Sequence, residues 1–255
     1  MAPTKKEIAI VTGAGSGIGR ATARAMRKEG RSVVVVDMDQ SSGTAVAQEV
    51  KGMFIRADLS KRKECREVVE RTLEEFGTVH ILVNNAGFQH VEAIETFPEE
   101  TWDRILATML TAPFLLSKYC WPSMRRQKYG RIVNIASTQG LIASPFKSAY
   151  VAAKHGIVGL TKSAALEGGP QGITVNAVAP AFVRTPLMQN QIKDLSESMK
   201  IPEDQVVEKV MLEPAAIKRF IEPEEVASLV AYLCSPQASA VTGVCWPIDL
   251  GWTAR

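Results

Sequence analysis

The sequence predicts an α/β fold built on a doubly wound parallel sheet of about seven strands, with helices on both faces. Two observations favour it. Short apolar runs, several of them β-branched at consecutive positions, alternate along the chain with longer amphipathic stretches. Uninterrupted apolar runs are typical of parallel strands buried on both faces, and repeated strand–helix–strand units joined by right-handed crossovers form a parallel sheet.

The predicted strands are residues 8–11, 33–36, 53–55, 79–83, 131–135, 173–178 and 241–248. The predicted helices include residues 16–29, 60–76, 99–124, 148–167 and 223–234. The last of these helices opens with Pro223 and two glutamates, and this composition suits a first helical turn.

Segment 185–220 departs from this alternation, because it is polar and helix-prone and follows a strand. We expect either a lid over a binding site or a helical insertion of purely structural use. No repeat, low-complexity stretch or linker marks a second domain. Residues 1–255 are therefore predicted to form one domain.

Composition excludes several classes of protein. Hydrophobic residues make up 46% of the chain, which argues against disorder. The 30 basic and 27 acidic residues are well mixed, so neither a nucleic acid nor a membrane is expected as a partner. No apolar run approaches the ~20 residues that span a bilayer, and the first run leads straight into a glycine turn rather than a cleavage site. We expect a cytoplasmic protein.

No metal site is expected, because the cysteines and histidines are far apart and lack metal-ligand spacing. They are Cys65, Cys120, Cys234 and Cys245, and His80, His90 and His155.

A glycine-rich turn follows the first predicted strand. It reads Thr-Gly-Ala-Gly-Ser-Gly-Ile-Gly from residue 12, with Gly13, Gly17 and Gly19 in the spacing G-xxx-G-x-G. A turn of this kind lets the backbone approach a pyrophosphate, which helix N-terminal amides then hold. The sequence therefore predicts a dinucleotide site that includes Ser16 and Ile18.

Asp37 ends the second predicted strand, 18 residues after Gly19. An acid here can accept hydrogen bonds from the adenosine ribose and repels a 2′-phosphate, which favours NAD over NADP. Arg20 and Arg24 lie nearby in sequence and leave some tolerance of NADP open. Further cofactor contacts are predicted where the third and fourth strands end, at Asp58, Leu59, Asn85, Ala86 and Gly87.

Tyr150 and Lys154 are four residues apart, so on a helix they face the same way. Ser137 follows the fifth predicted strand. An unperturbed tyrosine has a pKa of about 10, and a lysine ammonium with a positive nicotinamide ring would lower it. The three residues predict an acid–base site in which Tyr150 transfers the proton, Ser137 orients the substrate oxygen and Lys154 also holds the cofactor ribose.

With these motifs in this order, the chain resembles the classical short-chain dehydrogenase/reductase family from residue 12 to residue 252. The resemblance implies a Rossmann-type single domain. It also implies nicotinamide contacts along the stretch that follows the sixth strand, from Pro180 through Val183 to Thr185. A homotetramer packed through helices 99–124 and 148–167 is expected on the same ground.

A narrower resemblance, to bacterial D-3-hydroxybutyrate dehydrogenases, lies in NNAGFQHV, SAYVAAKHGIVGLTK, VRTPLMQNQI and GWTAR. It implies that a substrate carboxylate is held by polar residues together with Trp252, beside Ser137 and Tyr150. Those polar residues are Gln89, Lys147 and Gln191. Gln139 stands where that subfamily has a histidine, and it is included in the predicted substrate site.

Three further positions depart from the pattern of the wider family. Met109 replaces a catalytic asparagine on the fourth helix, Ala181 replaces the glycine of a Pro-Gly turn, and Leu250 replaces a glycine near the end. Met109 is predicted either to line the pocket, with the proton path using Thr108, Thr111 or another water, or simply to pack.

The sequence thus predicts an NAD-dependent enzyme that interconverts a small 3-hydroxy acid and its 3-oxo acid. A polyol or sugar dehydrogenase and a 3-oxoacyl reductase are alternatives within the family, although Asp37 argues against the NADPH that such reductases use. A catalytically weak NAD(H)-binding protein is the alternative from another class. Met109 favours it, whereas Ser137, Tyr150 and Lys154 argue against it.

Overall fold

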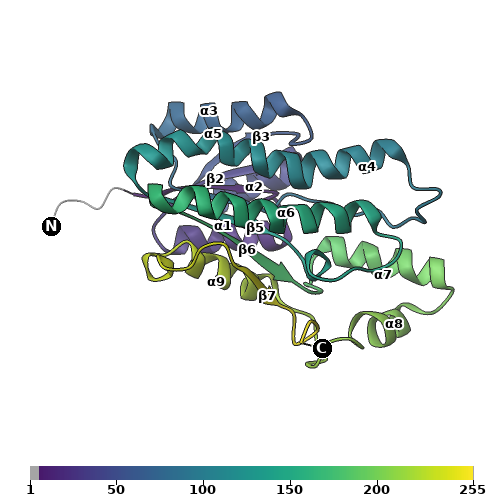
Figure 1. Cartoon of the computed structure of the whole chain (residues 1–255). Coiled ribbons are helices and arrows are strands. Elements are labelled where there is room, and N and C mark those ends of the chain that lie inside the picture. Colours follow the sequence, from purple (N-terminus) through teal and green to yellow (C-terminus); the bar gives the residue numbers. More distant parts are fainter. Residues whose placement is uncertain (1–5, 255) are drawn as a thin grey trace.

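The computed structural model describes residues 6–254, except the side chains of residues 190, 194, 198 and 199. At its centre lies one seven-stranded parallel sheet, in the order β3-β2-β1-β4-β5-β6-β7 (Figure 1). The strands are β1 (Ile8–Thr12), β2 (Ser32–Asp37), β3 (Met53–Arg56), β4 (Ile81–Asn84), β5 (Gly130–Ile135), β6 (Ile173–Pro180) and β7 (Cys245–Ile248). The predicted doubly wound sheet is confirmed.

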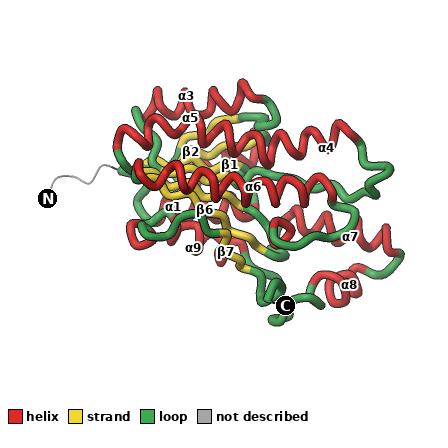
Figure 2. Tube along the Cα trace, viewed as in Figure 1, coloured by secondary structure: helices red, strands yellow, loops and turns green. Residues whose placement is uncertain are grey.

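Helices cover both faces of this sheet (Figure 2). One face packs against α1 (Gly17–Lys28), α2 (Gln40–Glu49) and α9 (Pro223–Leu233). The other packs against α3 (Arg62–Phe76), α5 (Ala112–Gln127) and α6 (Ser148–Gly168). Helix α9 begins at the predicted proline, with a capping box between Glu222 and Glu225.

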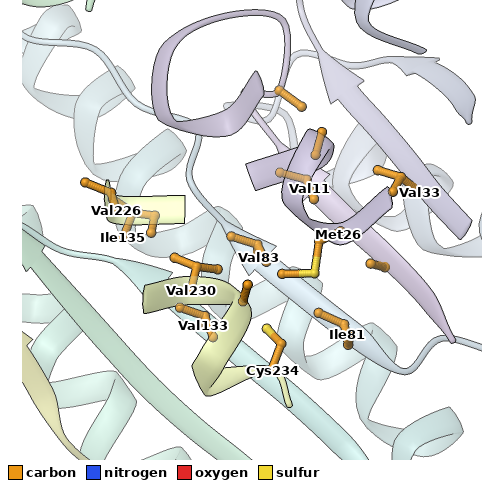
Figure 3. Close-up of a cluster of buried hydrophobic side chains, with 14 of the residues drawn as sticks. Val11, Met26, Val33, Ile81, Val83, Val133, Ile135, Val226, Val230 and Cys234 are labelled. Carbon is orange, nitrogen blue, oxygen red and sulfur yellow. The ribbon is translucent and has the colours of Figure 1, made fainter. Parts of the chain in front are cut away.

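The core consists of two apolar layers, one on each side of the sheet. Along β1, Ala9 and Val11 point into one layer, and Ile8 and Ile10 point into the other. Figure 3 shows the first layer, where Val11 and neighbouring strand valines meet Met26 of α1 and side chains of α9. Because both faces of the strand are buried, every position of the run must be apolar.

The order of the strands places a crevice at one edge of the sheet. Val11 of β1 pairs with Val35 of β2 on one side and with Val83 of β4 on the other. The chain therefore winds outward from β1 through β2 and β3, and then returns to the opposite side of β1 with β4. In sheets of this topology, ligands bind at the carboxyl ends of the two strands where the winding reverses.

The structure differs from the predicted elements at several places. The predicted helix 99–124 is α4 (Glu99–Leu106) followed by a π-helical turn (Ala107–Thr111) and α5. Helix α2, absent from the predicted helices, contains two serines, a glycine and a threonine, all weak helix formers. It begins because the side chain of Asp39 accepts a hydrogen bond from the backbone of Ser42 at 2.7 Å.

The segment 185–220 contains α7 (Pro186–Met199), α8 (Glu203–Val206) and a second π-helical turn (Val207–Met211). Its apolar side chains form a small core of their own, which includes Met188, Val206 and Phe220. In Figure 1 this segment extends beyond the carboxyl end of the sheet. Within residues 6–254, no helix combines the length and hydropathy needed to cross a membrane.

Candidate active site

A cleft of about 540 Å³ opens at the carboxyl ends of the strands and runs beneath α7. Every predicted site residue except Gly19 lines it. From the cofactor prediction these are Gly13, Ser16, Gly17, Ile18, Asp37, Asp58, Leu59, Asn85, Ala86, Gly87, Pro180, Val183 and Thr185. From the catalytic and substrate predictions they are Gln89, Ser137, Gln139, Lys147, Tyr150, Lys154, Gln191 and Trp252.

The glycine turn is shaped for a close backbone approach. Gly13 has φ +60°, and a Cβ on it would lie 2.8 Å from the Cα of Ala86. Gly19 lies one turn into α1, where a Cβ would lie 2.1 Å from the carbonyl oxygen of Gly13. Gly19 is therefore needed for the helix to approach the turn, even though it does not line the cleft. The N-terminus of α1 faces the cleft at Gly17, where backbone N–H groups suit a pyrophosphate.

Asp37 lines the cleft at the end where the sequence predicts the adenosine ribose. Its Oδ2 accepts a hydrogen bond from the backbone N–H of Gly15 at 2.8 Å, and its Oδ1 accepts one from Asp39 at 3.0 Å. Arg20 and Arg24, which the sequence left as possible partners for a phosphate, both form ion pairs with Glu49. The negative charge of Asp37 thus faces the cleft while the nearby positive charges are engaged elsewhere.

Thr12, which the sequence analysis did not single out, joins the ends of β1 and β4. Its hydroxyl accepts hydrogen bonds from the backbone N–H groups of Asn85 at 2.9 Å and Ala86 at 3.1 Å. The side chain of Asn85 donates to the carbonyls of Thr12 and Gly13 at 2.9 and 3.0 Å. These bonds fix the two strand ends that frame the cleft. Thr12 opens the predicted glycine-rich turn, but that pattern does not reveal its hydrogen bonds, because its partners lie more than 70 residues away.

Asp58 lines the cleft at the end of β3, where the sequence places an adenine contact. Its Oδ1 accepts hydrogen bonds from the backbone of Ser60 at 3.1 Å and from its hydroxyl at 2.7 Å. Lys61 lies 3.5 Å from the second carboxylate oxygen. The carboxylate is therefore held in a fixed orientation beside the cleft.

The structure brings Ser137, Tyr150 and Lys154 together. Lys154 Nζ donates a hydrogen bond of 2.6 Å to the carbonyl oxygen of Ile135 and lies 5.5 Å from the centroid of the Tyr150 ring. The Ser137 Oγ accepts a hydrogen bond from the backbone of Gln139 at 3.1 Å. Two elements thus supply the group: the end of β5 and one face of α6.

The protonation of this group is set mainly by burial. Burial lowers the pKa of Lys154 to about 7. Burial also raises the pKa of Tyr150, although a hydrogen bond with Ser137 opposes it. Without a cofactor the pKa of Tyr150 is therefore raised. The predicted lowering invoked a bound nicotinamide, whose positive charge would favour the phenolate.

On the substrate side, Lys147 is a buried cation. It is 9% exposed, immediately precedes α6, and forms no ion pair within the described part of the chain. Burial lowers the pKa of Lys147 to about 8. A buried ammonium without a carboxylate is costly unless a ligand supplies the negative charge.

Three glutamine side chains in the same cleft have buried polar atoms without a hydrogen-bond partner. These atoms are Nε2 of Gln89, Oε1 of Gln139 and Nε2 of Gln191. Buried amide groups are rarely left unsatisfied unless a ligand or water completes them. The donors of Gln89 and Gln191 have the polarity that a carboxylate needs.

Two aromatic rings line the cleft beside Lys147. Phe182 and Trp252 are stacked, with ring centroids 5.3 Å apart and planes at 25°. Lys147 Nζ lies 5.9 Å from the centroid of the Phe182 ring. The sequence analysis did not identify Phe182, although its place two residues after Pro180 put it next to predicted contacts.

Met109 lies in the π-helical turn and is 3% exposed. It packs against Ile105, Ala149 and Ala153, and a Cβ on Gly87 would lie 3.3 Å from its methyl carbon. Because Met109 also lines the cleft, both predicted readings describe part of its role. The residues that the structure describes contain no group of three histidine, cysteine or acidic side chains arranged for a metal ion.

Comparisons with known proteins agree with this geometry. The family described as enoyl-(acyl carrier protein) reductase matches residues 13–253. The D-beta-hydroxybutyrate dehydrogenase of Rhizobium meliloti is 45% identical over 97% of the chain and 98% of its own length. That of Cupriavidus necator is 42% identical over 97% and 98%. The crystal structure of levodione reductase superposes with a TM-score of 0.89 and 34% identity, covering 97% of this chain and 98% of that one.

Fold and site together define an oxidoreductase that uses a nicotinamide cofactor. The chain belongs to the short-chain dehydrogenase/reductase family. More distant relatives carry other substrates in their names, among them a cyclohexanol dehydrogenase at 38% identity and a 3-oxoacyl-[acyl-carrier-protein] reductase at 33%. The family is therefore established more firmly than the substrate.

Proposed function

We propose that the protein interconverts a small 3-hydroxy acid, 3-hydroxybutyrate or a close analogue, and the corresponding 3-oxo acid, with NAD as cofactor. The observation that carries the proposal is the buried Lys147, which has no ion-pair partner in residues 6–254 and shares its cleft with the unsatisfied amide donors of Gln89 and Gln191. One cation with amide donors suits a carboxylate. A neutral polyol or sugar would leave that charge buried and unpaired.

The residues that would hold the cofactor are the glycine turn, the strand ends at Asp37 and Asp58, and the residues after β6. When bound, the nicotinamide ring supplies the hydride acceptor or donor. NAD is favoured over NADP because Asp37 would repel a 2′-phosphate, and because Arg20 and Arg24 already pair with Glu49. The negative charge of Asp37 at this end of the cleft therefore favours a ribose without a 2′-phosphate.

Tyr150 acts as the acid–base group. During oxidation its phenolate accepts the substrate hydroxyl proton as the carbonyl forms, and during reduction the phenol returns that proton. Ser137 donates a hydrogen bond to the same oxygen and fixes its place. Lys154 keeps one ammonium N–H on the carbonyl of Ile135 and has two more donors for the cofactor ribose and the proton path.

The resemblance to the family also supports a cytoplasmic homotetramer. All four cysteines are free thiols, which fits a reducing compartment. Phe114 on α5 is 46% exposed and Leu166 on α6 is 82% exposed, so both helices present apolar side chains outward. Subunit contacts through these two helices would cover them.

The test of the substrate is Lys147→Ala, assayed on 3-hydroxybutyrate and on butan-2-ol, a neutral secondary alcohol of similar size. Loss of the charge-assisted contact should cost ~1.5–3 kcal/mol in kcat/KM for the acid and little for the alcohol. If the wild-type enzyme does not oxidise the acid, or if both substrates lose equally, the carboxylate site is wrong. A polyol or sugar substrate would then be favoured.

A further inference from the structure

The chain ends in a turn, residues 249–253, that is organised around one buried carboxylate. Asp249 is 8% exposed. Its Oδ1 accepts a hydrogen bond from the backbone of Gly251 at 3.0 Å, and its Oδ2 accepts from the backbone of Thr253 at 2.8 Å and from its hydroxyl at 2.6 Å. Burial alone would raise the pKa of Asp249, but these hydrogen bonds outweigh it and hold the pKa below its usual value.

The backbone of this turn would not be expected to hold its shape unaided. Leu250 has φ +58° and Gly251 has φ +82°, so two consecutive residues are left-handed. That conformation is unfavourable for leucine, whose Cβ crowds its own carbonyl oxygen. The three hydrogen bonds to Asp249 span the pair and fix it in place.

The turn presents Trp252 to the substrate side of the cleft. The backbone of Trp252 donates a hydrogen bond of 3.1 Å to the carbonyl of Asp249, and its ring stacks on Phe182. The ammonium of Lys147 lies 5.9 Å from the centroid of the same Phe182 ring. A continuous line of contacts therefore runs from Asp249 through two aromatic rings to the cation proposed to bind the substrate.

The same turn holds the end of segment 185–220. The carbonyl oxygen of Leu250 accepts hydrogen bonds from the backbones of Ala216 at 2.8 Å and Ile217 at 3.1 Å. A Cβ on Gly251 would lie 3.0 Å from the Cβ of Ala216, so the two backbones approach closely. A change in the turn would therefore displace the C-terminal end of segment 185–220 as well as Trp252.

We propose that Asp249 is a positioning residue for the substrate side of the site: it holds the turn 249–253 in the form that lays Trp252 on Phe182 and anchors the segment that covers the cleft. The identity of the substrate in this inference rests on the proposed function. The contacts that link Asp249 to Trp252 and Phe182 do not depend on it. Asp249 does not line the cleft, whereas Trp252 does. Its effect belongs in the binding of the acid and not in the chemical step.

The test is Asp249→Asn in the full-length enzyme, with KM and kcat measured on 3-hydroxybutyrate and NADH affinity measured by titration. An amide nitrogen cannot accept the bonds that the second carboxylate oxygen accepts. KM for the acid should rise by roughly tenfold, the size expected for losing a hydrogen bond to a charged group, with kcat and NADH affinity changed less than about twofold. Glu74→Gln, a matched loss of one carboxylate at an exposed position on α3 that does not line the cleft, should leave all three unchanged.

A double-variant cycle separates positioning from general destabilisation. If Asp249 acts through Trp252, Asp249→Asn should raise KM no further in a Trp252→Ala background. If the double variant instead raises KM by the product of the two single effects, the two residues act independently and the proposal is wrong. If Asp249→Asn fails to fold, Thr253→Val removes one donor, keeps the carboxylate and is tested in the same cycle.

Tryptophan emission provides a readout that does not depend on the substrate. Asp249→Asn should shift the emission of the otherwise wild-type protein and cause no shift in a Trp252→Phe background. If the emission of Asp249→Asn is the same as that of the wild type, Asp249 does not position Trp252. If the wild type does not oxidise 3-hydroxybutyrate, the proposed function fails while this measurement still decides the role of Asp249.

Discussion

Lys147 combines a positive charge with burial, so its titration should affect the proposed binding of a carboxylate substrate. Its pKa, about 8, is well below that of an ordinary lysine, so the charged form that a carboxylate needs is lost above that pH. KM for 3-hydroxybutyrate should be flat below pH ~8 and then rise, approaching tenfold per pH unit. The measurement is KM from pH ~7 to ~10.

The matched control for this titration is the neutral alcohol butan-2-ol. Its KM should not follow the same curve, because an alcohol does not need the ammonium charge. Titration of Tyr150 or Lys154 would move kcat for both substrates, and can therefore be told apart. An acid KM that stays constant to pH ~10 would contradict a carboxylate contact at Lys147.

Tyr150 transfers the proton in the proposed reaction. Tyr150→Phe removes the hydroxyl that carries this proton and keeps the aromatic ring. Turnover should fall by the ~10²–10⁴ typical of a lost acid–base group. NADH binding, measured by fluorescence titration, should be retained because the cleft keeps its shape. Near-normal turnover would show that another group transfers the proton.

In the proposed function, the preference for NAD over NADP comes from Asp37 together with the Arg20–Glu49–Arg24 group. Asp37→Ala should narrow the ratio of kcat/KM between NAD and NADP, because it removes the repulsion of a 2′-phosphate. Adding Glu49→Ala removes the acceptor that both arginines share and should raise kcat/KM with NADP further. Equal efficiency of the wild type with NAD and NADP would rule out this account.

At the level of single residues, sequence reasoning reached the groups that carry chemical signatures. The glycine turn and the Tyr150/Lys154 spacing are local patterns, so they could be recognised without a structure. The roles of Thr12, which opens that turn, and of Phe182 could not be predicted, because they arise from contacts with residues distant in sequence. The effect of burial on the pKa of Tyr150 was also beyond reach, since burial is a property of the folded chain. The lowering predicted for the enzyme with a bound nicotinamide stays a prediction.

At the level of elements, the helix that carries Met109 offers a prediction. Met109→Asn should fold and keep activity, but the buried amide should lower the free energy of unfolding by about 1–3 kcal/mol if it stays unpaired. Met109→Leu, which conserves volume, should cost less than about 1.5 kcal/mol. Thermal unfolding and kcat of both variants are the measurements, and loss of the fold in the asparagine variant would assign Met109 to the core alone.

The predicted elements failed where periodicity gives little signal. A π-helical turn keeps the apolar spacing of a helix almost intact, so residues 99–124 read as one helix. Helix α2 is short and rich in residues that favour turns, and its N-cap residue, Asp39, is the main local signal for a helix there. The parallel strands were predicted well, because burial on both faces leaves a continuous apolar run.

At the scale of the whole molecule, the exposed apolar side chains of α5 and α6 predict the oligomeric state. The wild-type mass in solution should correspond to four copies of the 27.7 kDa chain. Phe114→Asp combined with Leu166→Asp should reduce it, because charges would be buried at the contact. A wild-type monomer, measured by light scattering at micromolar concentration, would contradict the proposed homotetramer.

The central place of β1 in the sheet has a consequence for synthesis on the ribosome. Val11 leaves the ribosome 72 residues before one of its neighbours, Val83, and β2, β3 and the helices α1, α2 and α3 lie between them in the sequence. Until then one edge of an apolar strand has no partner, and such edges promote aggregation of nascent chains. The chain therefore depends on the early pairing of β1 with β2, and on whatever protects the other edge until β4 arrives.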